Sequence, residues 1–424
     1  MSTLKDSRKK PRSWFGLVVI ILLILSSVQS SGIAAPPKSF QFDVTPHADA
    51  TIEWWYANAH VTASNGHRYA VVASFFRTGN GHSPFDPSVR QPRGHYLIYR
   101  ITDLNTGVHR AYSLCDRAMV GQLASIAPLM LLQSPHDPGL RILFNDLVRG
   151  TVPAPSNVVP GASSVRTVPF TFSFDPKCFL SRSDETGSLT LTLGGWGRDA
   201  ITMAFTAQRP VMLVGGKDPD EKSRLGQLFY YSTTHTSVTG TLDAGTGPIR
   251  VTTGIGWFDH QWGDVVGMAH GGWDWWGVQL ANGTDILFYR GRNANAVETE
   301  QGTATFMDPQ GHQFTTHDVT FEASRRWQSA ETGITYPTVW SVGFPKLNLH
   351  LTIRAAVQNQ EIKTLVGGKA IWEGSCDVVA VYPKHHVVSG TSFMELVGYG
   401  SAPHATRDNA KGRMSNAKGN VTPP

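Results

Sequence analysis

Residues 53–77 read EWWYANAHVTASNGHRYAVVASFFR, and residues 274–290 read DWWGVQLANGTDILFYR. Both stretches begin with an acid and two tryptophans, pass through Asn-Gly, and end in two aromatic residues and an arginine. Asn-Gly is a favoured pair for a two-residue hairpin turn, because both turn positions need a positive φ. Each stretch therefore predicts a β-hairpin, with its turn at Asn65-Gly66 or at Asn282-Gly283.

The two predicted hairpins share their cross-strand partners when each turn is a two-residue loop. The first tryptophan of each hairpin then faces the arginine, and the second tryptophan faces the aromatic residue that precedes this arginine. The pairs are Trp54 with Arg77 and Trp55 with Phe76 in the first hairpin, and Trp275 with Arg290 and Trp276 with Tyr289 in the second. The arms of the first hairpin are longer by an even number of residues, which preserves the face of each side chain. The pattern favours two related β domains. The alternative is two unrelated hairpins with ordinary aromatic pairs.

Length and composition agree with an all-β chain of two domains. A chain of 424 residues is long for one core, and its 42 Gly, 25 Pro, 20 Phe, 12 Trp and 11 Tyr favour short strands joined by tight turns. We expect little helix after the N-terminal segment. The predicted divisions are a first β domain over 40–208, a linker over 209–227, and a second β domain over 228–400.

The two ends of the chain differ from its body. A basic start (Lys5 to Arg12) precedes the apolar run 14–25 and the small-residue stretch 26–35, which is the order of a secretory signal. We therefore predict that residues 1–35 are a signal peptide or, if uncleaved, an N-terminal membrane anchor, and that the protein is secreted or periplasmic. The segment 401–424 is rich in Ala, Asn, Lys, Gly and Pro and is predicted to be disordered.

Several function classes lack support in the sequence. The net charge of +5 comes from the two ends, so no nucleic-acid partner is expected. No zinc-protease, serine-hydrolase, P-loop or dinucleotide-binding motif occurs, and the 16 His residues are scattered, so we predict no cofactor and no metal site. The odd set Cys115, Cys178 and Cys376 allows one disulfide and one spare thiol. Oligomeric state is left open.

A tryptophan-rich strand is predicted over 256–263, with the sequence GWFDHQWG. Phe258, His260 and Trp262 share one face of such a strand, because side chains alternate. An imidazole between two aromatic rings is placed to exchange protons near neutral pH. The alternative is that His260 is a hydrogen-bonded core residue.

Five short motifs occur in one order along residues 40–400: Glu53-Trp54-Trp55-Tyr56, Tyr230-Tyr231-Ser232 leading to Val238-Thr239-Gly240-Thr241-Leu242, Trp257 to Trp262, Trp372-Glu373-Gly374, and Glu395-Leu396-Val397-Gly398-Tyr399. In these motifs the chain resembles the carotenoid 1,2-hydratase and AttH-like lipocalin family. The resemblance implies two lipocalin-like antiparallel β-barrel or half-barrel domains and a hydrophobic substrate without a cofactor. Family members hydrate carotenoid or isoflavonoid double bonds, and fungal relatives shape Diels–Alder cyclisations.

The resemblance also implies a site, built in the hydratases from a His-x-Trp pair and a Tyr-x-Asp pair. His260 and Trp262 match the first pair and Tyr289 matches the tyrosine, but position 291 is glycine. The predicted hairpin pairing sets Asp274 opposite Gly291, so we interpret Asp274 as the source of the carboxylic acid. The alternative is that Asp274 only ends a strand and is solvated. The candidate catalytic residues are then His260, Asp274 and Tyr289. The candidate substrate-binding residues are Trp262, Trp276, Trp257 and Trp55.

The sequence thus predicts an exported protein that acts on an isoprenoid, polyketide or phenolic compound by acid/base hydratase, isomerase or cyclase chemistry. A non-catalytic carrier of such a compound is the main alternative, and a structural protein is another. Catalysis by these residues requires His260 and Asp274 to face one pocket, and the carrier becomes the better interpretation if they do not. A membrane contact is expected only through the N-terminal segment, if that segment is not cleaved.

Overall fold

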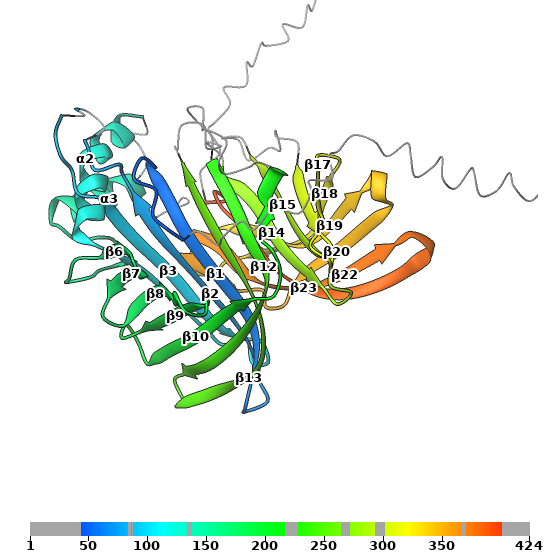
Figure 1. Ribbon diagram of the computed structural model, residues 1–424. Coiled ribbons are helices and arrows are strands. Elements are labelled where there is room, and N and C mark those ends of the chain that lie inside the picture. The colour runs from blue at the N-terminus through cyan, green and yellow to red at the C-terminus, as the bar shows by residue number, and fades with distance from the viewer. Residues whose placement is uncertain are drawn as a thin grey trace, which may run out of the picture.

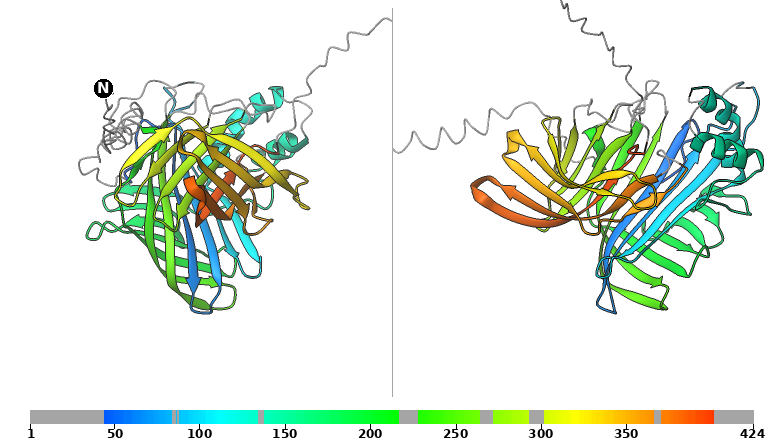
Figure 2. Two further views of the ribbon diagram at one scale, coloured as in Figure 1. Left: turned by 90° about the vertical axis from the view of Figure 1, so that its right-hand side faces the viewer. Right: turned by 180° about the vertical axis from the view of Figure 1, so that it is seen from behind.

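The computed structural model describes residues 44–83, 86, 88–133, 138–216, 228–263, 272–292, 302–365 and 370–400. They form two strongly curled sheets that stand side by side, the first of 13 strands and the second of 10 (Figures 1 and 2). All neighbouring strands pair antiparallel except β4 and β5. The predicted all-β fold of two half-barrels is confirmed.

The first sheet contains, in spatial order, β5 (Asn157–Val158), β4 (His109–Cys115), β3 (Gly94–Asp103), β2 (Arg68–Thr78), β1 (Ile52–Ala63), β13 (Pro248–Gly263), β12 (Leu228–Ala244), β10 (Asp199–Ala207), β9 (Leu189–Gly194), β8 (Cys178–Arg182), β7 (Phe170–Asp175) and β6 (Ser164–Thr167), with β11 (Met212–Leu213) paired to β12. The second sheet contains β17 (Gln313–Thr316), β16 (Thr303–Met307), β15 (Asp285–Gly291), β14 (Trp273–Leu280), β23 (His386–Leu396), β22 (Ala370–Tyr382), β20 (Leu349–Ala355), β19 (Thr335–Phe344) and β18 (Thr320–Gln328), with β21 (Glu361–Lys363) paired to β22.

Helices are few, as the composition predicts. The α-helices and short 3-10 turns of the described residues are α2 (Arg117–Gln133), α3 (Pro138–Val148), η1 (Val214–Gly216), η2 (Pro345–Leu347) and η3 (Pro383–His385). The connection between β4 and β5 holds α2 and α3, which lie at one end of the first sheet (Figure 1). Sequence analysis did not predict these two helices, because Gly121 and Pro128 interrupt the apolar pattern of α2.

Each sheet curls around an apolar core on its inner face. Trp55, Phe75 and Phe258 belong to the core of the first sheet, and Trp276 and Phe288 to that of the second. A third cluster, which includes Tyr56, Tyr96, Trp257, Trp275 and Leu287, packs between the two sheets. The central strands are therefore buried on both faces, and outer strands such as β7 alternate between buried and partly exposed residues.

Both predicted hairpins form, but their register is one residue away from the predicted one. Three-residue loops replace the predicted two-residue turns, because Ala63 pairs with His67 and Leu280 pairs with Thr284. Each loop ends in a glycine at a φ of 82° or 84°, the geometry of a type I turn with a bulge. The observed pairs, which are the same in both hairpins, are Glu53 with Arg77, Trp54 with Phe76, Asp274 with Arg290, and Trp275 with Tyr289.

The division between the sheets does not coincide with the predicted linker. Strands β12 and β13, over 228–263, belong to the first sheet, where β13 pairs with β1 along its length. The first sheet ends at Gly263 and the second begins at Trp273. Sequence order suggested otherwise because β13 follows the charged segment and its partner β1 lies near the start of the chain.

Some predictions fall outside the described residues. The signal or anchor segment 1–35, the tail 401–424 and most of the linker lie there. In the part of the chain that the structure describes, no helix is long and apolar enough to cross a membrane. The three cysteines are described, and all are buried and free rather than joined in a disulfide.

Candidate functional site

A row of polar side chains crosses the inner wall of the first sheet. Cross-strand pairing sets Glu53 of β1 opposite Arg77 of β2, and Arg77 opposite His95 of β3. Side chains two residues along, such as Trp55 and Leu97, belong to the core of this sheet, so all three polar side chains face inward. The row lies where the strands end, so polar groups replace the apolar side chains of the core.

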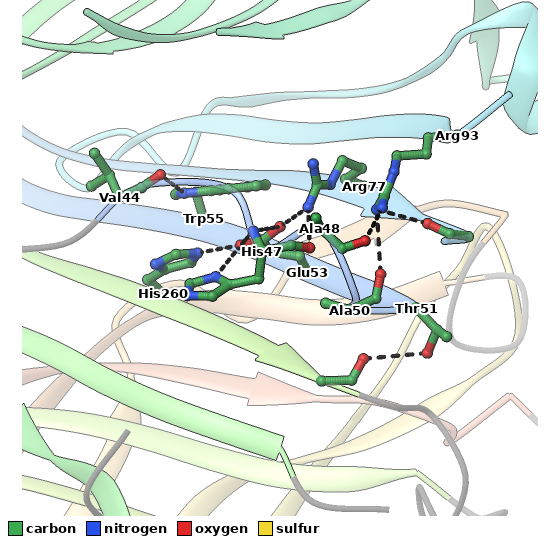
Figure 3. A network of polar contacts seen from close by, with 12 residues as sticks. Val44, His47, Ala48, Ala50, Thr51, Glu53, Trp55, Arg77, Arg93 and His260 are labelled. Atoms are coloured by element: carbon green, nitrogen blue, oxygen red, sulfur yellow. Dashed lines mark hydrogen bonds and ion pairs between the residues drawn. The ribbon is translucent and has the colours of Figure 1, made fainter. Parts of the chain in front are cut away.

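Glu53 is the centre of a buried network (Figure 3). Its Oε1 lies 2.8 Å from Nδ1 of His47 and 2.9 Å from Nε2 of His260, and its Oε2 accepts a hydrogen bond from Arg77. Burial by itself raises the pKa of Glu53, but the hydrogen bonds from the two histidines and the nearby positive charges outweigh it and lower the pKa to about 2. Glu53 is therefore a permanent negative charge inside the half-barrel.

His260 has the aromatic surroundings predicted for it. Its ring stacks on Trp55 with a centroid distance of 4.9 Å and lies 4.7 Å from the ring of Trp262. Nε2 faces Glu53, and Nδ1 lies 3.2 Å from the hydroxyl of Tyr231. Because His260 is fully buried and both ring nitrogens are engaged, it positions Glu53 and has no nitrogen left for a ligand.

The candidate catalytic residues do not meet in one place. Asp274 is buried on the inner face of the second sheet, where Nε of Arg290 and the hydroxyl of Tyr399 each lie 2.9 Å from it. Tyr289 pairs with Trp275, and both pack between the sheets. The prediction that His260, Asp274 and Tyr289 face one pocket is therefore wrong for two reasons. The three-residue turn sets Arg290, not Gly291, opposite Asp274 and so places Tyr289 on the other face, and the pairing of β13 with β1 places His260 in the first sheet.

The candidate substrate-binding tryptophans are also divided among layers. Trp55 lies in the core of the first sheet, and Trp262 lies beside it, stacked on His47 with a centroid distance of 3.9 Å. Trp276 lies in the core of the second sheet. Trp257 packs between the sheets and donates a hydrogen bond of 2.6 Å to Asp259. Only Trp55 and Trp262 accompany His260.

A cavity of about 580 Å³ opens at the same end of the first half-barrel. Charged side chains and small residues line it: Arg77, Arg93, His95, Asp116, Arg117, Pro92, Ala118, Pro160, Gly161, Ala162, Ser163, Ser164 and Val165. Its volume lies within the usual range for small-molecule sites. Arg77 joins this cavity to the buried network, because it lines the cavity and also bonds Glu53.

His95 and Asp116 form an oriented pair in the cavity wall. Nδ1 of His95 lies 2.7 Å from Oδ2 of Asp116, and Oδ1 accepts the backbone N–H groups of His95 and Met119. Asp116 thus caps α2 and fixes the orientation of the imidazole through Nδ1, which leaves Nε2 as the second ring nitrogen. No hydrogen bond reaches that nitrogen from the described residues.

Sequence analysis missed this pair. Asp116 is a favoured type of helix cap, but α2 itself was not predicted, and His95 lies 21 residues away. Only the pairing of β3 with β4 brings the two side chains together.

Two imidazoles and a carboxylate are also a common zinc-ligand set, and the ligand atoms of His47, Glu53 and His260 lie within 4.8 Å of one another. These residues are the ones that would hold a metal ion in the described part of the chain. Arg77 already neutralises Glu53, and its positive charge opposes a second cation at the same carboxylate.

A second group of acids is buried between the sheets. Asp259 accepts hydrogen bonds from Tyr230 and Trp257, and Tyr56 donates to Glu373, which pairs across strands with Glu395. Burial raises the pKa of Asp259 and of Glu395 to about 7 and raises the pKa of Glu373 well above its usual range. These contacts join the two sheets.

We expect these raised pKa values to make stability fall as pH rises. A carboxyl that ionises near pH 4 in the unfolded chain and near pH 7 in the folded one binds more protons when folded, so ionisation favours unfolding across this window. In Asp259→Asn, the fall in the free energy of unfolding between pH 4 and pH 8 should be smaller by several kcal/mol. Urea unfolding at a series of pH values measures this fall. The exposed Asp184→Asn is the control, and parallel curves for wild type and Asp259→Asn would contradict the prediction.

Comparison with known proteins places the chain in a family. A family model described as AttH-like matches residues 157–399. An AttH protein from Nitrosomonas europaea superposes with a TM-score of 0.61 at 22% identity, covering 87% of this chain and 99% of that one. Kievitone hydratase from Nectria haematococca gives a TM-score of 0.55 at 14% identity, covering 87% and 95%. No curated protein sequence matches significantly. The chain belongs to the AttH-like family.

Proposed function

We propose that the protein transforms a hydrophobic small molecule, such as an isoprenoid, a polyketide or a phenolic compound, by acid/base chemistry without a cofactor. The oriented pair of His95 and Asp116 in the wall of the cavity carries this proposal. It replaces the predicted trio of His260, Asp274 and Tyr289, whose members face three different layers. The fold shared with kievitone hydratase supports a hydratase or a related isomerase or cyclase.

The geometry gives each group a role. Asp116 orients His95 through Nδ1, so Nε2 accepts a proton from the ligand in an isomerisation, or from the water that adds to the ligand in a hydration, and once protonated returns it to another atom of the ligand. Arg77 lies in the same cavity wall and stabilises negative charge that develops on a ligand oxygen. Glu53 accepts a hydrogen bond from Arg77, and His260 is hydrogen-bonded to Glu53, so both are positioning residues for the guanidinium. Hydration and isomerisation next to a carbonyl both proceed through such proton transfers.

Solvent isotope incorporation tests the proposal across the whole substrate class. The purified protein is incubated in D₂O with a panel of apolar alkenes and enones, and the recovered compounds are measured by mass spectrometry. Deuterium or added water in one compound, above the uncatalysed level, is the expected result. If compounds of the panel bind but none changes in mass, the protein is better described as a non-catalytic carrier. The separation of His260, Asp274 and Tyr289 also supports a carrier.

We further propose that the protein works outside the cytoplasm, on the basis of its basic start and short apolar run. N-terminal sequencing of the exported protein should then begin near Pro36. An intact Met1 in the membrane fraction would support an anchor, and an intact soluble protein in the cytoplasm would contradict both forms of the proposal.

A further inference from the structure

We propose that the ligand of the 580 Å³ cavity is an acidic amphiphile, an apolar molecule with one carboxylate or similar oxyanion, and that Arg93 and Arg117 bind the anionic group. This inference rests on the proposed function only in using the same cavity. It adds the charge of the ligand and the residues that select it.

The charges of the cavity wall are unbalanced. Three guanidinium groups line it, from Arg77, Arg93 and Arg117, and the only carboxylate in the lining is that of Asp116. Glu53, behind the wall, compensates Arg77. Asp116 is already engaged by His95 and by the start of α2. The lining itself therefore carries more positive than negative charge, and the carboxylates that offset it, Glu53 and Asp49, lie outside the lining.

The hydrogen-bond partners of these arginines support the same conclusion. Arg93 donates to the backbone carbonyls of Gly79, Ala48 and Ala50, and burial lowers its pKa although Glu53 and Asp49 act in the opposite direction. Arg77 is buried, and its Nε has no partner among the described residues. A buried guanidinium without a full set of acceptors is costly, and an anion in the adjoining cavity offsets part of that cost through its charge.

Arg117 provides the most accessible charge. It is the exposed first residue of α2, and within the described chain it forms no ion pair. Asp116 already caps this helix, so the argument rests on the arginine side chains and not on the helix terminus.

The rest of the lining explains why the ligand is also apolar. Pro92, Ala118, Pro160, Ala162 and Val165 contribute small apolar surfaces, and the ring of His95 touches Phe172 of the core, edge on, at a centroid distance of 5.5 Å. A small inorganic anion would leave this surface and most of the volume unfilled. An amphiphile fills both parts.

Two fluorescent probes separate charge from hydrophobicity. Anilinonaphthalene sulfonate carries one anionic group, and phenylnaphthylamine has the same rings without it. We expect the wild-type protein to bind the sulfonate at least about tenfold more tightly than the neutral probe at low salt, and we expect Arg117→Glu to remove most of that preference. Added salt should weaken only the binding of the sulfonate.

Arg149→Glu is the matched control, since Arg149 is an exposed arginine next to the end of α3 and does not line the cavity. An acid at the start of α2 favours the helix, so lost binding in Arg117→Glu cannot come from an unfolded α2. Equal affinity for both probes, or an unchanged preference in Arg117→Glu, would overturn the inference and leave the proposed function standing. Failure of both probes to bind would instead remove the hydrophobic cavity ligand on which both rest.

Discussion

His95→Gln is expected to lower the rate of proton transfer to the bound substrate by about 10²- to 10⁴-fold, with the Kd of the ligand nearly unchanged. Glutamine still fits beside Asp116 and donates a hydrogen bond to it, but its amide neither accepts nor returns a proton near neutral pH. The rate is measured as deuterium incorporation from D₂O under saturating ligand, and the Kd by fluorescence titration. This separation of rate from affinity is what distinguishes a catalytic residue from one that only shapes the cavity.

His67→Gln is the matched control for this prediction. His67 follows the first hairpin loop, and its Nδ1 lies 2.8 Å from Asp103, so the variant alters a second His–Asp pair that does not line the cavity. Its rate should equal that of the wild type. A His95→Gln protein that keeps full activity, or that loses ligand affinity and rate in the same proportion, would remove His95 from the mechanism.

Glu53→Ala is expected to lower the free energy of unfolding by about 3–5 kcal/mol. The substitution leaves the Arg77 guanidinium buried without its carboxylate and also deprives His47 and His260 of their shared acceptor. Burying an unpaired charge costs more than the ion pair itself contributes. Chemical denaturation at neutral pH measures the loss, because the pKa of Glu53, about 2, keeps the carboxylate ionised there.

The double variant Glu53→Ala with Arg77→Met is the control that isolates this cause. Removing both charges should restore a large part of the lost stability, since the site then holds no unpaired guanidinium. Asp274→Ala should destabilise the second sheet similarly, because Asp274 and Arg290 occupy the equivalent hairpin positions. A Glu53→Ala protein as stable as the wild type, or a double variant less stable than the single one, would contradict this account.

The repeated hairpins show how far the sequence alone predicts this fold. Their existence and their relationship follow from local signals, the acid-Trp-Trp start and the Asn-Gly turn. Their register depends on whether the loop holds two or three residues, and the same Asn-Gly pair serves both. That single residue separated Tyr289 from Asp274, because it moved Arg290 into the place expected for Gly291. The separation of His260 from Asp274 has another cause, the place of β13 in the first sheet.

Local sequence patterns could not predict which distant segments of the chain pair with one another. His260 meets Glu53 across 207 positions of the chain, and only the pairing of β13 with β1 brings them together. The aromatic setting of His260 was predictable from strand alternation. Its carboxylate partner was not, since Glu53 carried only the signal of a hairpin motif. His95 carried no local signal beyond its place at the start of a strand.

The place of β12 and β13 in the first sheet governs how the nascent chain folds on the ribosome. When residues up to 227 have emerged, β1 and β10 already exist, but the two strands that lie between them in the finished sheet have not been made. Both edges then offer unpaired backbone groups to other chains, which is a route to aggregation. The first half-barrel closes only after Gly263 has left the exit tunnel. Cutting the chain at the charged segment before β12 would therefore yield an incomplete sheet with exposed edges and not an independent domain.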